Sequence, residues 1–404
     1  MKKEVKVRKI ITFLGLKRSI VAMLLMSVFM GLGERLSERF LPIYLIALGG
    51  SAMMIGLLNW MDNFLGAVYS VVGGYLSDRL GYKRALNVFT MIAIPGYLLV
   101  ILIPQWWAVL LGAVLFISWT AISTPASMTL VHQVLPEGKK VMGVSLHSMV
   151  RRIPMALGPI IGGVLISTYG TKHGIRWSFV LAIILALLSL IVQQRLVRKD
   201  DPTRASAPRI RFRFTKPMRH LLVSDILIRY CEQIPYAFVV VWVVTNHGIN
   251  AARFGILTAI EMVTALLIYI PVATVAARID KKKLIMVSYV MFTFFPVVIM
   301  VSSSFTAFVI AFVVRGLKEF GEPSRKSLIM ELAPAESKAT SFGAYYFLRD
   351  TIVSFAALGG AYLWRQSPVW SFVAAAGFGG TAIIYFLIFY NQIIQENTGR
   401  RIQC

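Results

Sequence analysis

Long apolar runs alternate with short polar segments along nearly the whole chain. An α-helix rises about 1.5 Å per residue and the hydrocarbon core of a bilayer is about 30 Å thick, so roughly 20 apolar residues cross it. Runs of this length can be drawn twelve times, near 19–47, 51–77, 83–103, 106–134, 141–169, 175–196, 220–245, 252–277, 284–302, 305–333, 338–364 and 368–392. The pattern predicts an all-α membrane protein with twelve transmembrane helices.

Composition and charge support this class. Hydrophobic residues make up 57% of the chain and charged residues 15%, and the net charge is +24. In a soluble protein that charge would suggest a nucleic-acid partner. Here the basic residues lie mostly in alternate loops, and the other loops hold only Lys172, Arg176, Arg253 and Arg365. This positive-inside distribution predicts a multi-pass protein of the bacterial plasma (inner) membrane with both termini in the cytoplasm and no nucleic-acid partner.

The longest inner loop divides the chain into two halves. It is rich in Arg and Pro and has almost no apolar periodicity. We therefore expect an N-terminal six-helix bundle over 1–197, a basic cytoplasmic linker over 198–219 and a C-terminal six-helix bundle over 220–404.

Two spacings recur on either side of the linker: a glycine six residues before an acid, and an arginine eleven residues before a glycine. The matching sets are Gly56 and Asp62 with Gly255 and Glu261, and Arg152 and Gly163 with Arg349 and Gly360. The repetition indicates that the halves are pseudo-symmetric copies of one six-helix unit.

A glycine-rich, charged turn separates the second and third apolar runs. Its marked positions are Gly74, Asp78, Arg79, Gly81, Lys83 and Arg84. Between two apolar runs, this pattern resembles the signature loop of the major facilitator superfamily of secondary transporters. The second half carries a decayed copy in which Ala277 stands where the first has Asp78. The resemblance implies two bundles that rock about a substrate site near the membrane midplane, and it makes this turn a conformational motif.

Ionisable residues inside the apolar runs are the candidate functional groups, because a charge at membrane depth is costly unless it faces a cavity or a partner. As proton-coupling candidates we take Glu34, Glu38, Asp62, Glu232 and Glu261. As substrate-binding candidates we take Arg35, Arg39, Arg152, Arg229, Arg315 and Arg349. The alternative is that some of these charges form purely structural ion pairs.

Helical spacing suggests some of the pairs. Arg35 and Glu38 are three residues apart and are expected to pair. Asp350 directly follows Arg349, and adjacent helical residues do not face each other, so on the structural alternative Glu232 would neutralise Arg349.

The sequence holds no phosphate-binding loop of the P-loop type and no evident metal-ligand cluster or nucleophile and base pair. We therefore expect no enzyme activity, no cofactor and no metal, and a monomer embedded in the lipid bilayer. The predicted function is secondary active transport of a small organic anion or zwitterion by alternating access, coupled to protons. Two alternatives remain: proton-driven multidrug efflux of lipophilic cations, and a non-transporting receptor or scaffold on a transporter fold.

Overall fold

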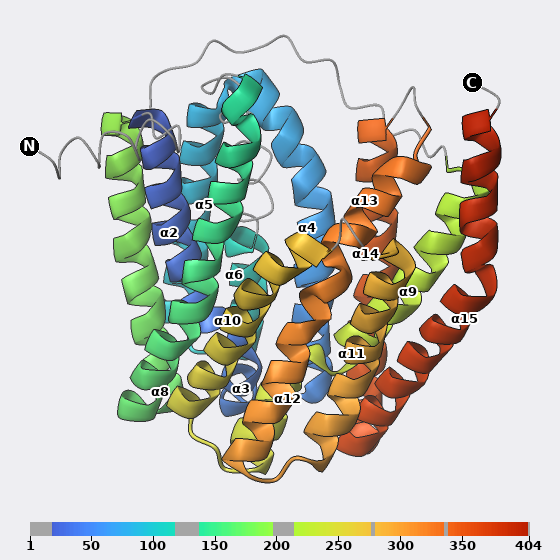
Figure 1. The fold of residues 1–404 in the computed structure, drawn as a ribbon. Coiled ribbons are helices and arrows are strands. Elements are labelled where there is room, and N and C mark those ends of the chain that lie inside the picture. Colours follow the sequence, from blue (N-terminus) through green and yellow to red (C-terminus); the bar gives the residue numbers. More distant parts are fainter. Residues whose placement is uncertain (1–17, 118–136, 197–213, 276–278, 335–337, 403–404) are drawn as a thin grey trace, which may run out of the picture. The chain divides into compact units, whose positions relative to one another are not determined.

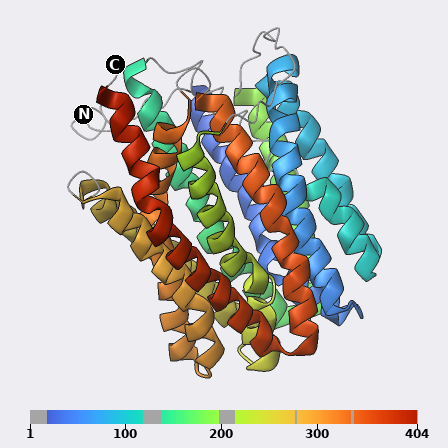
Figure 2. The ribbon, with the colours of Figure 1, turned by 90° about the vertical axis from the view of Figure 1, so that its right-hand side faces the viewer.

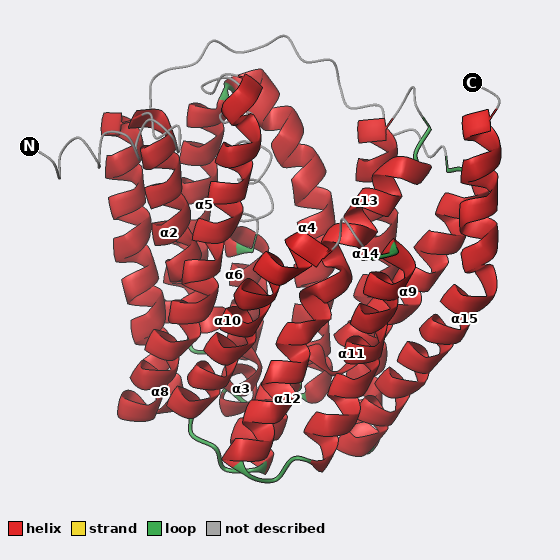
Figure 3. Ribbon diagram, viewed as in Figure 1, coloured by secondary structure: helices red, strands yellow, loops and turns green. Residues whose placement is uncertain are grey.

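Helices make up almost all of the described structure. The computed structural model describes residues 18–117, 137–196, 214–275, 279–334 and 338–402. Within these ranges there is no strand, and short loops join the helices (Figure 3). Six helices in this part of the chain are long and apolar enough to cross a membrane. The fold is that of an all-α membrane protein, and its layout fits twelve helices in two bundles.

The chain divides into two compact units. Unit 1 comprises Met1–Gly49 and Leu65–Pro208, and unit 2 comprises Gly50–Phe64 and Arg209–Cys404. Helix α4 (Ala52–Leu80) therefore contributes its first half to unit 2 and its second half to unit 1.

Unit 1 is built around the packing of its first helix on its longest one. Its elements are α2 (Arg18–Ser37), η1 (Glu38–Phe40), α3 (Leu41–Ala47), the second half of α4, α5 (Tyr82–Leu102), α6 (Trp106–Phe116) and α8 (Glu137–Leu196). Helix α8 contains two predicted spans, because Gly170 has a φ of 77° and breaks its helical geometry there. Helix α2 lies along α8 (Figure 1).

Unit 2 holds the remaining elements, with α9 at its centre. They are α9 (Lys216–Tyr236), η2 (Val241–Asn246), α10 (Ala251–Val275), α11 (Lys281–Val301), α12 (Phe305–Leu317), η3 (Lys318–Gly321), α13 (Glu322–Leu332), α14 (Lys338–Gln366) and α15 (Pro368–Ile402). Helix α9 packs against α11, α14 and α15, and Figure 2 shows α15 running beside it.

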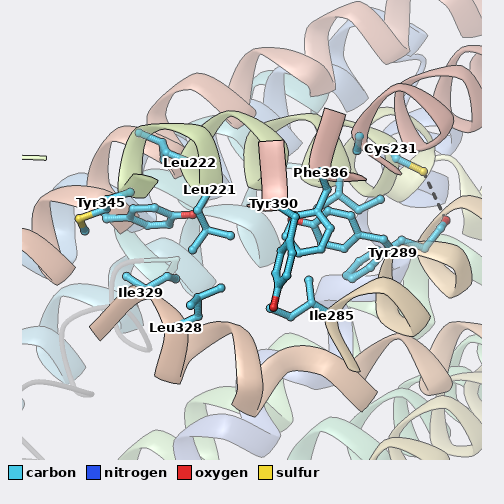
Figure 4. Packing of buried hydrophobic residues seen from close by; sticks show 14 of the residues in the cluster. Leu221, Leu222, Cys231, Ile285, Tyr289, Leu328, Ile329, Tyr345, Phe386 and Tyr390 are labelled. Atoms are coloured by element: carbon cyan, nitrogen blue, oxygen red, sulfur yellow. Dashed lines mark hydrogen bonds between the residues drawn. The ribbon is translucent and has the colours of Figure 1, made fainter. Parts of the chain in front are cut away.

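Aromatic and aliphatic side chains fill the core of unit 2. Tyr289 of α11 packs on Phe386 of α15, with ring centroids 5.2 Å apart, and Phe386 packs on Tyr390 at 5.3 Å (Figure 4). The buried Cys231 thiol donates a hydrogen bond to the Phe292 carbonyl oxygen at 3.3 Å. This core holds α9, α11 and α15 together and fixes the orientation of the charged face of α9.

Two spans are broken at charged residues. The first predicted span changes from α-helix to a 3₁₀ turn at Glu38–Phe40, and the tenth does so at Lys318–Gly321. The second break is held by α11, where the Ser288 hydroxyl donates to the Lys318 carbonyl oxygen. A 3₁₀ stretch inside a helix often marks a functional hinge. Both breaks therefore place charged side chains where the backbone geometry changes.

Glycine contacts define how the two halves correspond. A Cβ on Gly162 would lie 1.8 Å from the Leu36 carbonyl oxygen, and one on Gly360 would lie 2.1 Å from the Ile234 carbonyl oxygen. Each glycine thus lets its helix touch the backbone of the first helix of its own half. Gly360 comes 198 positions after Gly162 in the sequence, and Ile234 comes 198 positions after Leu36. The arginine that corresponds to Arg349 is therefore Arg151, so the sequence-based match to Arg152 is wrong by one residue.

Candidate functional site

A continuous series of ion pairs runs through unit 2. We call it the ion-pair chain. Its members alternate in sign in the order Arg315, Glu261, Lys318, Glu232, Arg229, Glu322, Arg325, Asp225, Arg349 and Asp350. The side chains come from α9, α10, α12, η3, α13 and α14. Apart from Asp350, every one of these side chains is at most 20% exposed.

The first members of the ion-pair chain join α10 to the tenth span, which is broken at η3. Arg315 Nε lies 3.2 Å from Glu261 Oε1, and the Arg315 guanidinium is enclosed by the rings of Tyr236, Phe295 and Phe312 at 5.0–5.7 Å. Such contacts stabilise a desolvated cation through the negative faces of the rings. The Arg315 side chain is 3% exposed, so it is held firmly in place.

Lys318 is shared between two helices. Its Nζ lies 2.6 Å from Glu232 Oε1 on α9 and 3.4 Å from Glu261 Oε1 on α10. Glu232 also accepts from Arg229 at 2.6 Å, so its carboxylate lies between two cations. Two of the coupling candidates, Glu232 and Glu261, thus share one ammonium group. A change in the protonation of either carboxylate changes the force that holds α9, α10 and the tenth span together.

The last members of the ion-pair chain are centred on Asp225, whose side chain is fully buried. Asp225 accepts from Arg325, from Arg349 at 3.3 Å, and from the Tyr345 hydroxyl at 3.3 Å. Glu322 also pairs with Arg325 and, at 3.3 Å, with Arg229. Each buried charge therefore has an opposite charge in contact, which is the condition for tolerating it at membrane depth.

The predicted partner of Arg349 is wrong. Arg349 pairs with Asp225 and also with the adjacent Asp350, at 2.7 Å, while Glu232 pairs with Arg229 and Lys318. Spacing along one helix predicts where Cβ atoms point, but the long Arg349 side chain curves back over the Tyr346 ring, 4.2 Å from its centroid, and reaches its neighbour.

The sequence did not predict a group of carboxamide side chains next to the ion-pair chain. Asn59 and Asn63 of α4 direct their Nδ2 groups to the Gln233 side-chain oxygen, at 3.4 and 3.3 Å. Gln233 directly follows Glu232, so α9 contributes adjacent residues to the amide group and to the ion-pair chain. Uncharged Asn and Gln in an apolar run carry a weak signal, so the pattern of ionisable residues does not indicate them.

The remaining candidates other than Asp62 lie in unit 1. Arg35 pairs with Glu38, as predicted from their spacing. Glu34, Arg39 and Arg152 each have interactions of their own. Asp62, in contrast, lies on the part of α4 that belongs to unit 2. Among the residues described, no group of three or more His, Cys, Asp or Glu side chains is arranged to hold a metal ion.

The charged turn of the signature motif joins α4 to α5. Gly81, with a φ of 79°, provides the left-handed residue that reverses the chain. Lys83 Nζ donates to the Gln194 carbonyl oxygen at 3.2 Å, and Gln193 Nε2 donates to the Lys83 carbonyl oxygen at 2.6 Å. These bonds fix the start of α5 to the end of α8. Gly74 and Asp78 belong to α4, but their surroundings lie outside the described part of the chain, and Arg84 is exposed.

Apolar helices with a buried ion-pair network and this turn are features of a multi-pass membrane transporter. Comparison with known proteins identifies the family: the Major Facilitator Superfamily sequence model matches residues 23–231 and 221–399. The chain belongs to this superfamily.

Individual relatives are distant. An uncharacterised MFS-type transporter of Methanocaldococcus jannaschii is 21% identical over 351 residues, covering 82% of this chain and 85% of the relative. The fosmidomycin resistance protein of Escherichia coli is 28% identical over 138 residues, covering 34% of this chain and 33% of that protein. Among solved structures, the nucleoside transporter NupG superposes with a TM-score of 0.76 at 14% identity, covering 92% of this chain and 99% of NupG. The fold is therefore shared, and the protein is a secondary transporter.

Proposed function

We propose that this protein carries a small organic anion or zwitterion across the membrane by alternating access, driven by protons. The observation that carries the proposal is the ion-pair chain of unit 2, in which buried carboxylates and cations of the predicted spans share partners. A substrate charge can replace one member of such a chain without leaving its partner unpaired. A carboxylate can exchange a proton when its cation moves away.

In this proposal Glu232 and Glu261 are the leading coupling groups, because both contact Lys318. Glu34, Glu38 and Asp62 are further coupling candidates. Arg229, Arg315 and Arg349 are the substrate-binding candidates of unit 2, and Arg35, Arg39 and Arg152 are those of unit 1. We place the protein in the bacterial inner membrane as a monomer with both termini in the cytoplasm.

A thermal-shift screen of the purified protein tests the proposal. The compounds are small organic anions, zwitterions and lipophilic cations, each at one acidic and one neutral pH. A ligand that binds the folded state raises the melting temperature by mass action. We expect an anion or zwitterion to do so with a pH-dependent effect. That compound should then accumulate in proteoliposomes only when a pH gradient is imposed.

A second candidate function is drug efflux. It is favoured by the similarity of one third of the chain to a fosmidomycin resistance protein. Stabilisation by lipophilic cations alone, combined with increased drug sensitivity of cells that lack the protein, would support efflux and contradict transport of an anion or zwitterion.

A further inference from the structure

The first half of α4 brings three polar side chains close together within unit 2. Asn59 and Trp60 precede Asn63 by four and three residues, and these spacings place side chains on the same side of a helix. This half of α4 packs closely on α14, because a Cβ on Gly56 would lie 2.4 Å from the Ala361 Cβ. The three side chains are therefore positioned by the packing of unit 2 itself.

The side chains of Asn59, Asn63 and Gln233, which we call the amide cluster, satisfy one another only in part. Both asparagine Nδ2 groups donate to Gln233 Oε1, and Asn63 Nδ2 also donates to the Asn59 carbonyl oxygen at 2.8 Å. A carboxamide has two N–H donors and an oxygen that accepts twice. Among the described residues, none accepts from Gln233 Nε2 and none donates to Asn63 Oδ1. One donor and one acceptor of the amide cluster are thus open to a further partner.

Trp60 adds a donor of the same kind. Its ring stacks on Phe64 with the centroids 4.9 Å apart and contacts Phe355 of α14 at 6.3 Å, so it is held from two sides. The Trp60 Nε1 atom is buried and has no hydrogen-bond partner in the part of the chain that the structure describes. A buried N–H group without an acceptor destabilises a folded protein, so its presence calls for a reason. A ligand atom that accepts this hydrogen bond would supply one.

The open groups define the chemistry of a complementary ligand. Gln233 Nε2 and Trp60 Nε1 are donors, and Asn63 Oδ1 is an acceptor. All three are uncharged, so they suit a neutral group that accepts two hydrogen bonds and donates one, which a carboxamide and a hydroxyl both do. The amide cluster also adjoins the ion-pair chain, since Glu232 and Gln233 are consecutive residues of α9.

We propose that Gln233, Asn63 and Trp60 bind a carboxamide or hydroxyl group of the transported substrate. This inference rests on the proposed function, which assigns the charged group of the same molecule to the ion-pair chain. The substrate is then a small anion or zwitterion that also carries an uncharged hydrogen-bonding group. A site built from polar groups rejects an apolar compound of the same shape, because its own donors and acceptor are left unpaired.

Pairs of isosteric compounds test the site. In each pair a methyl or isopropyl group replaces the polar group at nearly the same volume. The anionic pairs are succinamate with isocaproate and lactate with isobutyrate, and the zwitterionic pairs are L-asparagine with L-leucine and L-threonine with L-valine. The measurement is the Kd of each compound, from its effect on the melting temperature of the purified full chain. We expect wild type to bind the polar member of at least one pair about tenfold more tightly or better.

Trp60→Phe removes the Nε1 donor and keeps an aromatic ring. We expect it to weaken binding of the polar member about three- to tenfold, the effect of one hydrogen bond, and to leave binding of the apolar member unchanged. Its basal melting temperature should stay the same or rise, because an unpartnered donor has been removed. Gln233→Leu should abolish the preference. Trp370→Phe makes the same change at a residue that is 58% exposed and should bind both members like wild type.

The outcomes separate this inference from the proposed function. If wild type binds both members of every pair equally, or prefers the apolar members, this inference is wrong, while binding of any of these compounds still supports the proposed function. If none of the compounds binds, this inference is wrong and the wider thermal-shift screen alone decides the proposed function. If Trp60→Phe keeps the full preference of wild type, the assignment of the site is wrong. Should Gln233→Leu not fold, Trp60→Phe decides, because it leaves the amide cluster intact.

Discussion

Individual side chains of the ion-pair chain differ in how many ion-pair and hydrogen-bond partners they contact. Asp225 is the most constrained acid, because it is fully buried and accepts from Arg325, Arg349 and Tyr345. Glu331 provides a contrast at the surface, where it pairs with Lys281 and is 38% exposed. A buried pair and an exposed pair are therefore available in the same unit.

Removal of the buried acid should destabilise the protein much more than removal of the exposed one. Asp225→Asn leaves two buried arginines with one carboxylate fewer each, and breaking a buried pair costs about 3–5 kcal/mol. Glu331→Gln should change stability by less than about 1 kcal/mol, because water solvates its partner. Thermal unfolding of the two detergent-purified variants measures the difference. Equal melting temperatures would show that the ion-pair chain does not stabilise the fold.

Glu232 and Glu261 should differ from Glu331 in function. If either carries the coupling proton, its Gln variant should keep substrate exchange and lose uphill accumulation driven by a pH gradient. Both quantities are measured in proteoliposomes with the compound found in the thermal-shift screen, and Glu331→Gln is the control. Retained accumulation in both variants would move the coupling role to Glu34, Glu38 or Asp62.

At the scale of helices, glycine contacts decide which elements approach closely. Gly162 and Gly360 leave no room for a Cβ, whereas Gly359 has no atom within 4 Å of that position. Gly→Ala in an exposed helix normally stabilises it by about 0.5–1 kcal/mol, because glycine is the more flexible residue.

At Gly162 and Gly360, replacement by alanine should destabilise the protein instead of stabilising it. Gly162→Ala and Gly360→Ala force the first and fifth helices of a half apart, so we expect a lower melting temperature and reduced transport. Gly359→Ala should leave the melting temperature unchanged or raise it slightly. Thermal unfolding of the three variants tests this, and a stable Gly360→Ala protein would mean that the helices separate without penalty.

The signature turn is an element whose role lies in the transport cycle. Arg79 is exposed and interacts locally with the Tyr75 hydroxyl at 3.4 Å, so it contributes little to packing. We expect Arg79→Ala and Asp78→Asn to insert and fold normally and to slow transport several-fold. Membrane yield, melting temperature and uptake rate are measured together. Wild-type rates in both variants would refute a conformational role for this turn.

Sequence periodicity predicted the helical elements well and their contacts less well. Apolar runs gave the spans, because crossing a bilayer dictates length and composition. They did not show the 3₁₀ turns at Glu38 and Lys318, which depend on packing against neighbouring helices such as α11. The correspondence of Arg349 with Arg151 required the backbone contact of Gly162, since adjacent glycines are equivalent in sequence.

At the scale of the whole molecule, the predicted topology can be tested by labelling. Lys172 lies on an expected outer loop and Lys281 on an expected inner one, and Cys231 is buried. In a Cys404→Ser background, Lys172→Cys should react with a membrane-impermeant maleimide in intact cells. Lys281→Cys should react only after the membrane is permeabilised. The opposite pattern would place both termini outside.

The ion-pair chain has a further consequence for energy conversion. Moving one elementary charge through a membrane potential of 100 mV changes its energy by about 2.3 kcal/mol. The chain carries five positive and five negative charges, so when its helices move together the electrical work on them cancels. Its reorientation is then electrically silent, and any voltage dependence of transport originates in the cargo, in the coupling ion and in charges outside the ion-pair chain.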